Sequence, residues 1–284
     1  MNTVFFTPRM VAESGSYSPS AAKPQAVVED WAAHGLDFSI VEPAPASFEE
    51  LCRAHDPTFV RGVLDRRIAN GFGNRSEAVA RALPYTSGAM LSAARHVLAV
   101  GGIAAAPCSG FHHAGHREAS GFCTFNGLMV TAAALRAEGR VERVGILDLD
   151  MHYGDGTDDI IGAIGAQSWI DHHTAGATAR RPDEAGAFLR RLPAIVRGMK
   201  GCDVILYQAG ADPHVDDPLG GWMTTDELRA RDAIVFAASR EIGAPLVWNL
   251  AGGYQRDAMG GIGPVLEIHR NTARAWLSAS PTPP

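Results

Sequence analysis

Apolar residues fall into short runs along the chain, and the segments between these runs mix apolar and polar residues at helical spacing. The short runs predict strands at 4–6, 103–106, 144–150, 168–171, 203–208 and 246–250. The other segments predict helices at 25–34, 87–100, 127–138, 157–164, 183–199, 225–242 and 263–278. Strands that alternate with helices predict an α/β fold, a mainly parallel sheet with helices on both faces. No repeat or linker interrupts the pattern, so we expect a single domain over residues 1–284.

Composition narrows the class of protein. A chain of 284 residues, 46% of them hydrophobic, can bury a large core without disulfides. The four cysteines, Cys52, Cys108, Cys123 and Cys202, form no CxxC pair, which predicts reduced thiols in a cytoplasmic protein. The N-terminus lacks a basic segment followed by an apolar core, so we expect no signal peptide. No apolar run is long enough to span a bilayer, so we expect no membrane partner. The net charge of −6 disfavours nucleic acid as a partner.

One stretch concentrates ionisable groups at the end of a predicted strand. Asp148, Asp150 and His152 follow the apolar run 144–147, and alternation along a strand would point all three to one side. Buried ionisable groups are costly unless something pairs them. A divalent metal would do so, and open α/β sheets place ligand sites at the carboxyl ends of their strands. A satisfied Asp/His network that caps the strand is the alternative.

Three more clusters follow predicted strands. His112 and His113 are adjacent in a loop bounded by glycines, Asp212 follows the strand 203–208, and Tyr254 follows Gly252 and Gly253 after the strand 246–250. Each has an ordinary explanation alone: a solvated loop, a turn, or a packed tyrosine. Their occurrence on successive strand ends indicates a common site.

The order of these motifs resembles the zinc-dependent histone deacetylase family, which includes bacterial acetylpolyamine amidohydrolases. The matching stretches are GFHHAGHREASGFCTFN (110–126), LDLDMHYGDG (147–156), GADPHVDDPL (210–219) and AGGY (251–254), with HDPTFV (55–60) before them. The resemblance implies the arginase/deacetylase fold. It also implies a hydrolase that removes an acyl group, expected to be acetyl, from a small-molecule or peptide amine such as acetyl-lysine or an acetylpolyamine.

The resemblance assigns the metal ligands to Asp150, His152 and Asp212, which would leave open positions for water and a substrate carbonyl. Zn²⁺ is the implied ion, and Fe²⁺ or Co²⁺ would also suit one histidine and two carboxylates. The ion would lower the pKa of the water and polarise the amide carbonyl.

The resemblance also assigns the catalytic groups. His112 and His113 correspond to the family's histidine dyad, with Asp148 orienting the first and Asp155 orienting the second. His113 is expected to be the general base, with His112 as electrostatic support. Tyr254 is expected to donate a hydrogen bond to the oxyanion.

Substrate contacts are implied at Gly121, Phe122, Leu219 and Gly252. Many members carry an aromatic that forms a second tunnel wall, but residues 174–179 contain none. The aspartate that grips the substrate backbone in many deacetylases has no clear match, and the loop 71–77 is only a candidate region. We therefore expect a wider pocket, or one completed by a partner subunit of a homo-oligomer.

A potassium site is implied as well. A gapless count from Asp150 assigns the inner monovalent cation to Asp148, Asp150, His152, Asp171 and His172. Asp171 stands where many members have serine, so this chain departs from the family pattern at that position.

Two other functions compete with this interpretation. A ureohydrolase of the arginase type shares the fold but binds two metals through an Asp-x-His-x-Asp run, whereas the spacing here is Asp150-x-His152-x-x-Asp155. A non-catalytic protein that binds acylated ligands could have the same fold and catalyse no reaction, although every reactive group is present here. Amide hydrolysis that a chelator abolishes would separate the enzyme from the binder.

Overall fold

The computed structural model describes residues 2–178 and 181–279, and in this part of the chain seven parallel strands form one sheet. The strand order is β2-β1-β3-β7-β6-β4-β5. The strands are β1 (Thr3–Phe5), β2 (Ser39–Val41), β3 (Ile103–Ala105), β4 (Val144–Asp148), β5 (Ile170–Thr174), β6 (Val204–Gln208) and β7 (Leu246–Asn249). The predicted fold class, a parallel sheet in an α/β domain, is confirmed.

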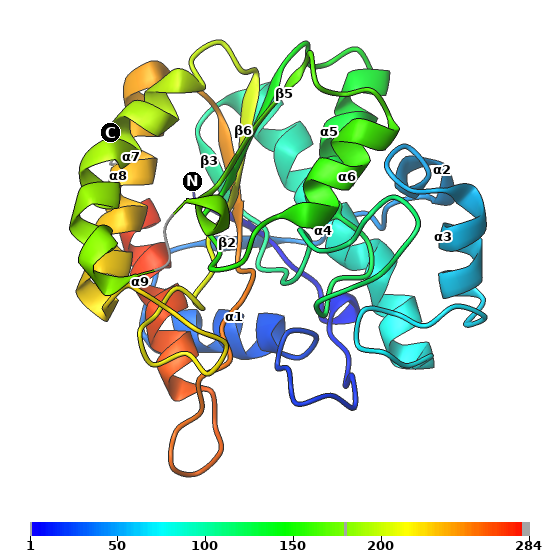
Figure 1. The fold of residues 1–284 in the computed structure, drawn as a ribbon, viewed down its shortest axis with the longest axis horizontal. Helices are drawn as coiled ribbons and strands as arrows, with labels where there is room; N and C mark the ends of the chain where they lie inside the picture. The colour runs from blue at the N-terminus through cyan, green and yellow to red at the C-terminus, as the bar shows by residue number, and fades with distance from the viewer. Residues whose placement is uncertain (1, 179–180, 280–284) are drawn as a thin grey trace.

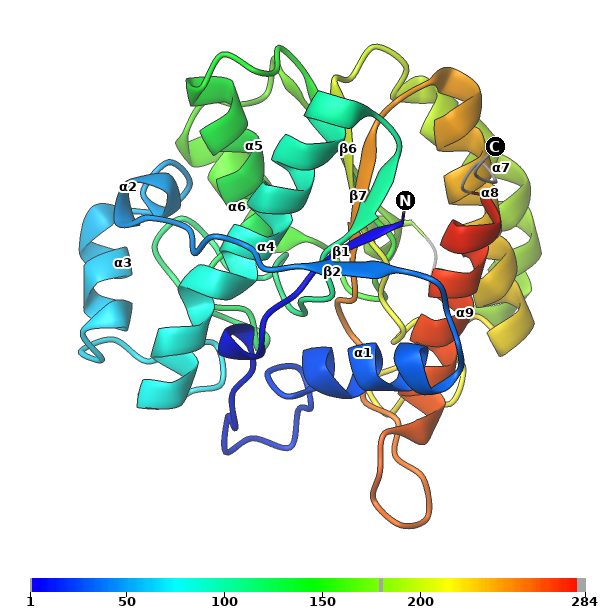
Figure 2. The same ribbon diagram turned by 180° about the vertical axis from the view of Figure 1, so that it is seen from behind.

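Helices lie on both faces of the sheet (Figures 1 and 2). They are α1 (Lys23–Ala33), α2 (Phe48–Leu51), α3 (Pro57–Leu64), α4 (Glu77–Val100), α5 (Gly127–Ala137), α6 (Asp155–Ala163), α7 (Ala185–Gly198), α8 (Thr225–Ile242) and α9 (Gly263–Ala279). Short 3-10 turns occur at Pro8–Met10, Ala175–Ala177 and Pro182–Glu184. Helices α4 to α6 cover one face and α7 to α9 the other, while α1 packs against α9 below the sheet.

The central strands read as continuous apolar runs because both of their faces are covered. Every residue of β4 and of β6 is buried, and the two strands pair with each other along their full length. Strands buried on both faces lose the alternation of apolar and polar residues that marks a half-exposed strand. All strands point the same way, so the loops after β3, β4, β6 and β7 meet at one edge of the sheet.

Three elements differ from the sequence prediction. Helix α4 begins at Glu77, where Ser76 caps it, and it continues through Pro84, a residue that normally ends a helix. Edge strand β2 was not predicted because it is short and mostly exposed. Strand β5 lies at Ile170–Thr174, later than predicted, and this shift matters for the site below.

None of the helices in the described part of the chain is long and apolar enough to cross a membrane. The four cysteines are all free thiols, as predicted from their spacing.

Candidate active site

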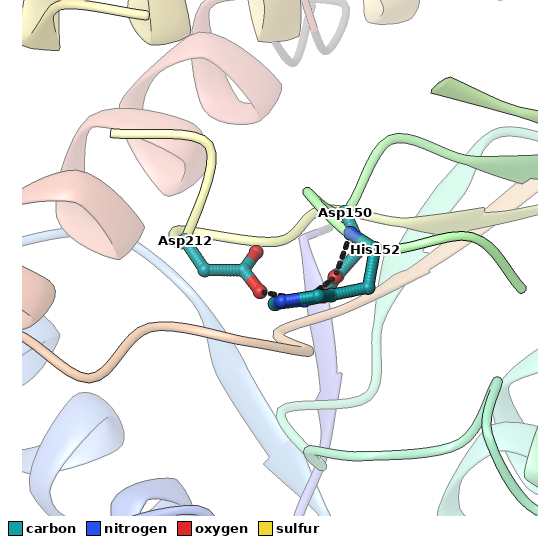
Figure 3. Close-up of side chains that lie close together, drawn as sticks. All are labelled: Asp150, His152 and Asp212. Atoms are coloured by element: carbon teal, nitrogen blue, oxygen red, sulfur yellow. Dashed lines mark hydrogen bonds and ion pairs between the residues drawn. The ribbon is translucent and has the colours of Figure 1, made fainter. Parts of the chain in front are cut away.

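Two strand ends bring one histidine and two aspartates together (Figure 3). Asp150 and His152 lie in the loop after β4, and Asp212 lies after β6. The Nδ1 atom of His152 is 3.3 Å from Oδ1 of Asp150 and 3.1 Å from Oδ2 of Asp212. One ligand atom from each of the three residues lies within 4.8 Å of the others. This donor set and spacing fit a divalent metal such as Zn²⁺.

The charges in this cluster favour a bound cation. Asp150 and Asp212 are almost completely buried. Burial raises the pKa of Asp212, and the neighbouring Asp150 carboxylate raises it further. Hydrogen bonds to both carboxylates raise the pKa of His152 to about 10. A proton therefore balances the carboxylates when no metal is bound, and a divalent ion would replace it.

Glycines and backbone amides shape this cluster. The amide of Gly252 donates to Oδ2 of Asp150 at 3.0 Å, and the amide of Met151 donates to Oδ1 of Asp212 at 3.2 Å. A Cβ atom on Gly252 would collide with the Asp212 carboxylate, and one on Gly210 would lie 2.8 Å from the Cα atom of Asp150. Both carboxylates therefore depend on close backbone approach that only glycine permits.

The adjacent histidines each contact the carboxylate that the sequence assigned to them. The Nδ1 atom of His112 is 2.7 Å from Oδ2 of Asp148, and Nδ1 of His113 is 2.6 Å from Oδ1 of Asp155. The two imidazole rings lie 4.1 Å apart, and the His113 ring is 5.8 Å from the His152 ring. The dyad therefore adjoins the candidate metal ligands.

The two histidines titrate in opposite directions. Burial alone would lower the pKa of His112, but the Asp148 and Asp150 carboxylates raise it to about 9. Burial lowers the pKa of His113, and the neighbouring His112 lowers it further. At neutral pH, His112 is therefore the charged member and His113 the neutral member that can accept a proton.

Tyr254 lies close enough to the Asp212 and Asp150 carboxylates to feel their charge. Its backbone amide donates to Oδ2 of Asp217 at 2.8 Å. Burial raises the pKa of the Tyr254 phenol, and the Asp212 and Asp150 carboxylates raise it further. The phenol therefore stays protonated and can act as a hydrogen-bond donor.

Lys23 is a component of the site that sequence reasoning missed. It is completely buried at the start of α1, and its Nζ atom donates to the carbonyls of Ala251 and, at 3.0 Å, Gly252. Ala251 has a left-handed φ of 62°, and its carbonyl also accepts from the Ser109 hydroxyl at 2.7 Å. Burial lowers the pKa of Lys23 to about 8. Its partners are backbone atoms more than two hundred residues away, so no local sequence pattern could reveal its role.

Two of the predicted substrate residues lie against the catalytic groups. Gly121, with φ of 54°, packs on His113 so closely that a Cβ atom would collide with the imidazole. The Phe122 ring lies 5.6 Å from the Tyr254 ring. The side chain of Leu219 is partly exposed. Its backbone amide donates to Oδ1 of Asp217 at 3.0 Å.

The aromatic neighbours of Phe122 come from distant loops. Tyr17 meets it edge-on at 5.3 Å between ring centroids, and Phe72 lies at 6.0 Å. The amide of Phe122 donates to the Gly71 carbonyl at 3.0 Å, so the loop 71–77 borders the site, although it contains no aspartate. Of the segment 174–179, which lacks the aromatic of the second tunnel wall, the structure describes residues 174–178, and Ala179 lies outside the described residues. The contact of Tyr17 with Phe122 was not predicted, because it joins residues more than a hundred positions apart.

Two of the residues predicted for the monovalent cation, Asp171 and His172, lie in β5. In the register of β4 with β5, Asp171 lies opposite Gly145 and His172 opposite Ile146, whereas Thr174 lies opposite Asp148. The Thr174 hydroxyl accepts the amide of Gly154 at 3.2 Å. Potassium binding at this place stays a prediction.

Fold and site together place a histidine dyad beside three residues that could hold a metal ion, at the carboxyl edge of a parallel α/β sheet. The family model described as histone deacetylase domain matches residues 19–179, and the chain belongs to this family.

Curated relatives carry consistent names. The chain is 29% identical over 235 residues to an acetylpolyamine amidohydrolase of Burkholderia pseudomallei, which covers 72% of this chain and 67% of that protein. It is 29% identical over 248 residues to a histone deacetylase-like amidohydrolase of Pseudomonas aeruginosa, covering 74% and 64%. It is 30% identical over 174 residues to histone deacetylase 2 of Arabidopsis thaliana, covering 52% of this chain but only 43% of that one.

Two solved structures share the fold. A crystal structure of acetylpolyamine aminohydrolase from Burkholderia pseudomallei superposes with a TM-score of 0.75 at 21% identity and covers 98% of both chains. The HDA15 HD domain superposes with a TM-score of 0.78 at 19% identity, covering 99% of this chain and 90% of the other. The family and the names of its relatives support a deacetylase or amidohydrolase activity.

Proposed function

We propose that this protein is a metal-dependent amide hydrolase that removes an acetyl group from an amine such as acetyl-lysine or an acetylpolyamine. The observation that carries the proposal is the histidine dyad. His112 and His113 are neighbours with opposite pKa shifts, and both adjoin a cluster that fits a divalent metal. A neutral base beside a charged partner suits attack by water on an amide.

The ion would be held by Asp150, His152 and Asp212, where it would supply an acidified water and polarise the substrate carbonyl. Zn²⁺ is our first choice of ion, with Fe²⁺ or Co²⁺ as alternatives. Only one group of ligand-type residues with metal spacing occurs among the residues that the structure describes. This favours a single-metal hydrolase over a two-metal ureohydrolase.

Separate side chains transfer the proton, offset the developing charge and bind the oxyanion. His113 accepts the proton of the attacking water at Nε2, because Asp155 occupies its Nδ1 position, and then returns this proton to the leaving amine. His112, whose Nδ1 atom is held by Asp148, would offset the negative charge that develops during attack. Tyr254 donates its phenol proton in a hydrogen bond to the oxygen that becomes negative. Gly121, Phe122, Leu219 and Gly252 would surround the substrate.

A panel of substrates tests the proposal. Purified protein with one added equivalent of Zn²⁺ should release acetate from acetyl-lysine peptides or acetylated polyamines. A chelator should abolish release, and the variant His113→Ala should reduce it strongly while still binding metal. Tight binding of acetylated ligands without hydrolysis would instead identify an acyl-ligand-binding protein, and release of urea from guanidino substrates would identify a ureohydrolase.

A further inference from the structure

Arg231 is a buried cation that the proposed reaction does not use. It lies on α8, and its side chain is only 1% exposed. Its Nε atom donates to Oδ1 of Asp232 at 2.8 Å. The Asp232 carboxylate also accepts the hydroxyl of Tyr207 and, at 2.5 Å, the hydroxyl of Thr272. These contacts alone would describe an ion pair in the core, with hydrogen bonds that compensate its burial.

One of the two terminal nitrogens of Arg231, Nη1, points to the candidate site instead of to the carboxylate. Its Nη1 atom donates to the Leu149 carbonyl at 3.1 Å and to the Gly210 carbonyl at 2.7 Å. Both carbonyls lie just beyond the ends of β4 and β6, which are neighbours in the sheet. The Leu149 carbonyl belongs to the peptide that joins it to Asp150, and Gly210 closely precedes Asp212.

We propose that Arg231 is a positioning residue. It fixes the Leu149–Asp150 peptide and the Gly210–Ala211 peptide, and through them the backbone from which Asp150 and Asp212 project toward the metal. Both carboxylates are buried and closely surrounded, so a small rotation of either peptide would move a ligand oxygen away from His152. The inference rests on the metal site of the proposed function.

The chemistry of arginine fits this role. A planar guanidinium presents Nε and Nη1 in fixed directions, so it can hold Asp232 and both carbonyls at once. A lysine has one nitrogen to share among these three acceptors. Groups that orient ligands behind a metal site typically change metal affinity by about 10- to 100-fold when they are removed.

Metal affinity separates positioning from a role in the core alone. We would measure the Kd for Zn²⁺ by competition with a chelator, and the thermal unfolding midpoint of the metal-free protein. The variants are Arg231→Lys and the double variant Arg231→Met/Asp232→Asn, which leaves no unpaired buried charge. The control is Tyr207→Phe, which removes a hydrogen bond to Asp232 but leaves the bonds of Arg231 to the backbone.

We expect the double variant to raise the Kd for Zn²⁺ by about tenfold or more, and Arg231→Lys to raise it by a smaller factor. Tyr207→Phe should lower the unfolding midpoint while its Kd stays within about twofold of the wild-type value. If the double variant does not fold, Arg231→Lys decides, because it keeps a charge opposite Asp232.

A wild-type Kd in a folded Arg231 variant would overturn the inference, since Arg231 would then serve the core alone. Failure of the wild-type protein to bind Zn²⁺ would instead overturn the metal site of the proposed function.

Discussion

At the scale of single residues, the assignment of roles rests on neighbours that differ in environment. His112 and His113 are adjacent in the sequence, yet the carboxylates around His112 raise its pKa while burial and the His112 charge lower that of His113. Pairs of titratable groups whose environments push their pKa values apart mark the acid and the base of a site.

The carboxylate of Asp155 raises the pKa of His113, so Asp155→Asn should lower this pKa further. The acid limb of the kcat/KM profile reports deprotonation of the base, and it should therefore move to lower pH. The plateau should fall by about 10- to 100-fold, because the imidazole loses its orienting partner. A pH–rate profile measures both effects, and an unmoved acid limb would remove His113 from the role of base.

Tyr254→Phe tests the oxyanion donor. The hydroxyl has most to do when negative charge develops on the carbonyl oxygen, so its contribution is larger in the transition state than in the ground state. We expect kcat to fall by about 10²–10³, or roughly 3–4 kcal/mol, with little change in KM or metal content. Steady-state kinetics on a good amide substrate decides, and a near-normal kcat would show that Tyr254 only packs at the strand end.

Some residues of the site were visible in the sequence and others were not. His112, His113, Asp150 and Tyr254 lie in short motifs next to strand ends, where local spacing carries information. Lys23 acts through backbone carbonyls more than two hundred residues away in the chain, so the residues around it do not reveal these partners.

At the scale of elements, the loop after β7 carries Tyr254 and depends on α1. Lys23 at the start of that helix holds the carbonyl of Ala251, whose left-handed φ of 62° is strained for a residue other than glycine. The loop that presents Tyr254 is thus held by a cation that burial disfavours.

This cation predicts a pH-dependent stability. The pKa of Lys23 is about 8 in the folded protein, below its ordinary value. Between that pH and about 10.5, the unfolded chain binds a proton that the folded chain does not, so the free energy of unfolding rises with pH. Relative to Lys23→Met, the wild-type protein should gain up to roughly 3 kcal/mol over this interval.

Denaturant unfolding at several pH values measures this difference, and Lys200→Met, at an exposed lysine, is the matched control. A difference between wild type and Lys23→Met that stays constant with pH would contradict the account.

A helix and a strand show where local sequence patterns succeed and where they fail. Helix α8 lies at Thr225–Ile242, as predicted, because its start is capped by Thr224 and its end by Gly243. Strand β5 was placed too early because its second half, with His172 and His173, is polar and resembles a loop. Pairing with β4 determines its position, and this pairing is a long-range contact that a local pattern does not contain.

At the scale of the whole molecule, the parallel sheet gathers loops from distant parts of the chain at one edge. The carboxylates gathered there are buried, so a bound divalent ion should stabilise the folded protein. Zn²⁺ at about a thousandfold excess over its Kd should add about 4 kcal/mol to the free energy of unfolding. Thermal or chemical unfolding with and without Zn²⁺ measures this gain. Asp212→Asn should remove most of it, and an equal gain in that variant would place the ion elsewhere.

The most direct test of the central claim is a titration of metal-free protein with Zn²⁺ while acetate release from an acetylated amine is recorded. The account predicts that activity rises from near zero and reaches its plateau at one equivalent of metal per chain, because Asp150, His152 and Asp212 form one site. A plateau at two equivalents would indicate a two-metal hydrolase. Full activity in the metal-free protein, or tight metal binding without hydrolysis of any acetylated amine, would contradict the claim that this is a metal-dependent deacetylase.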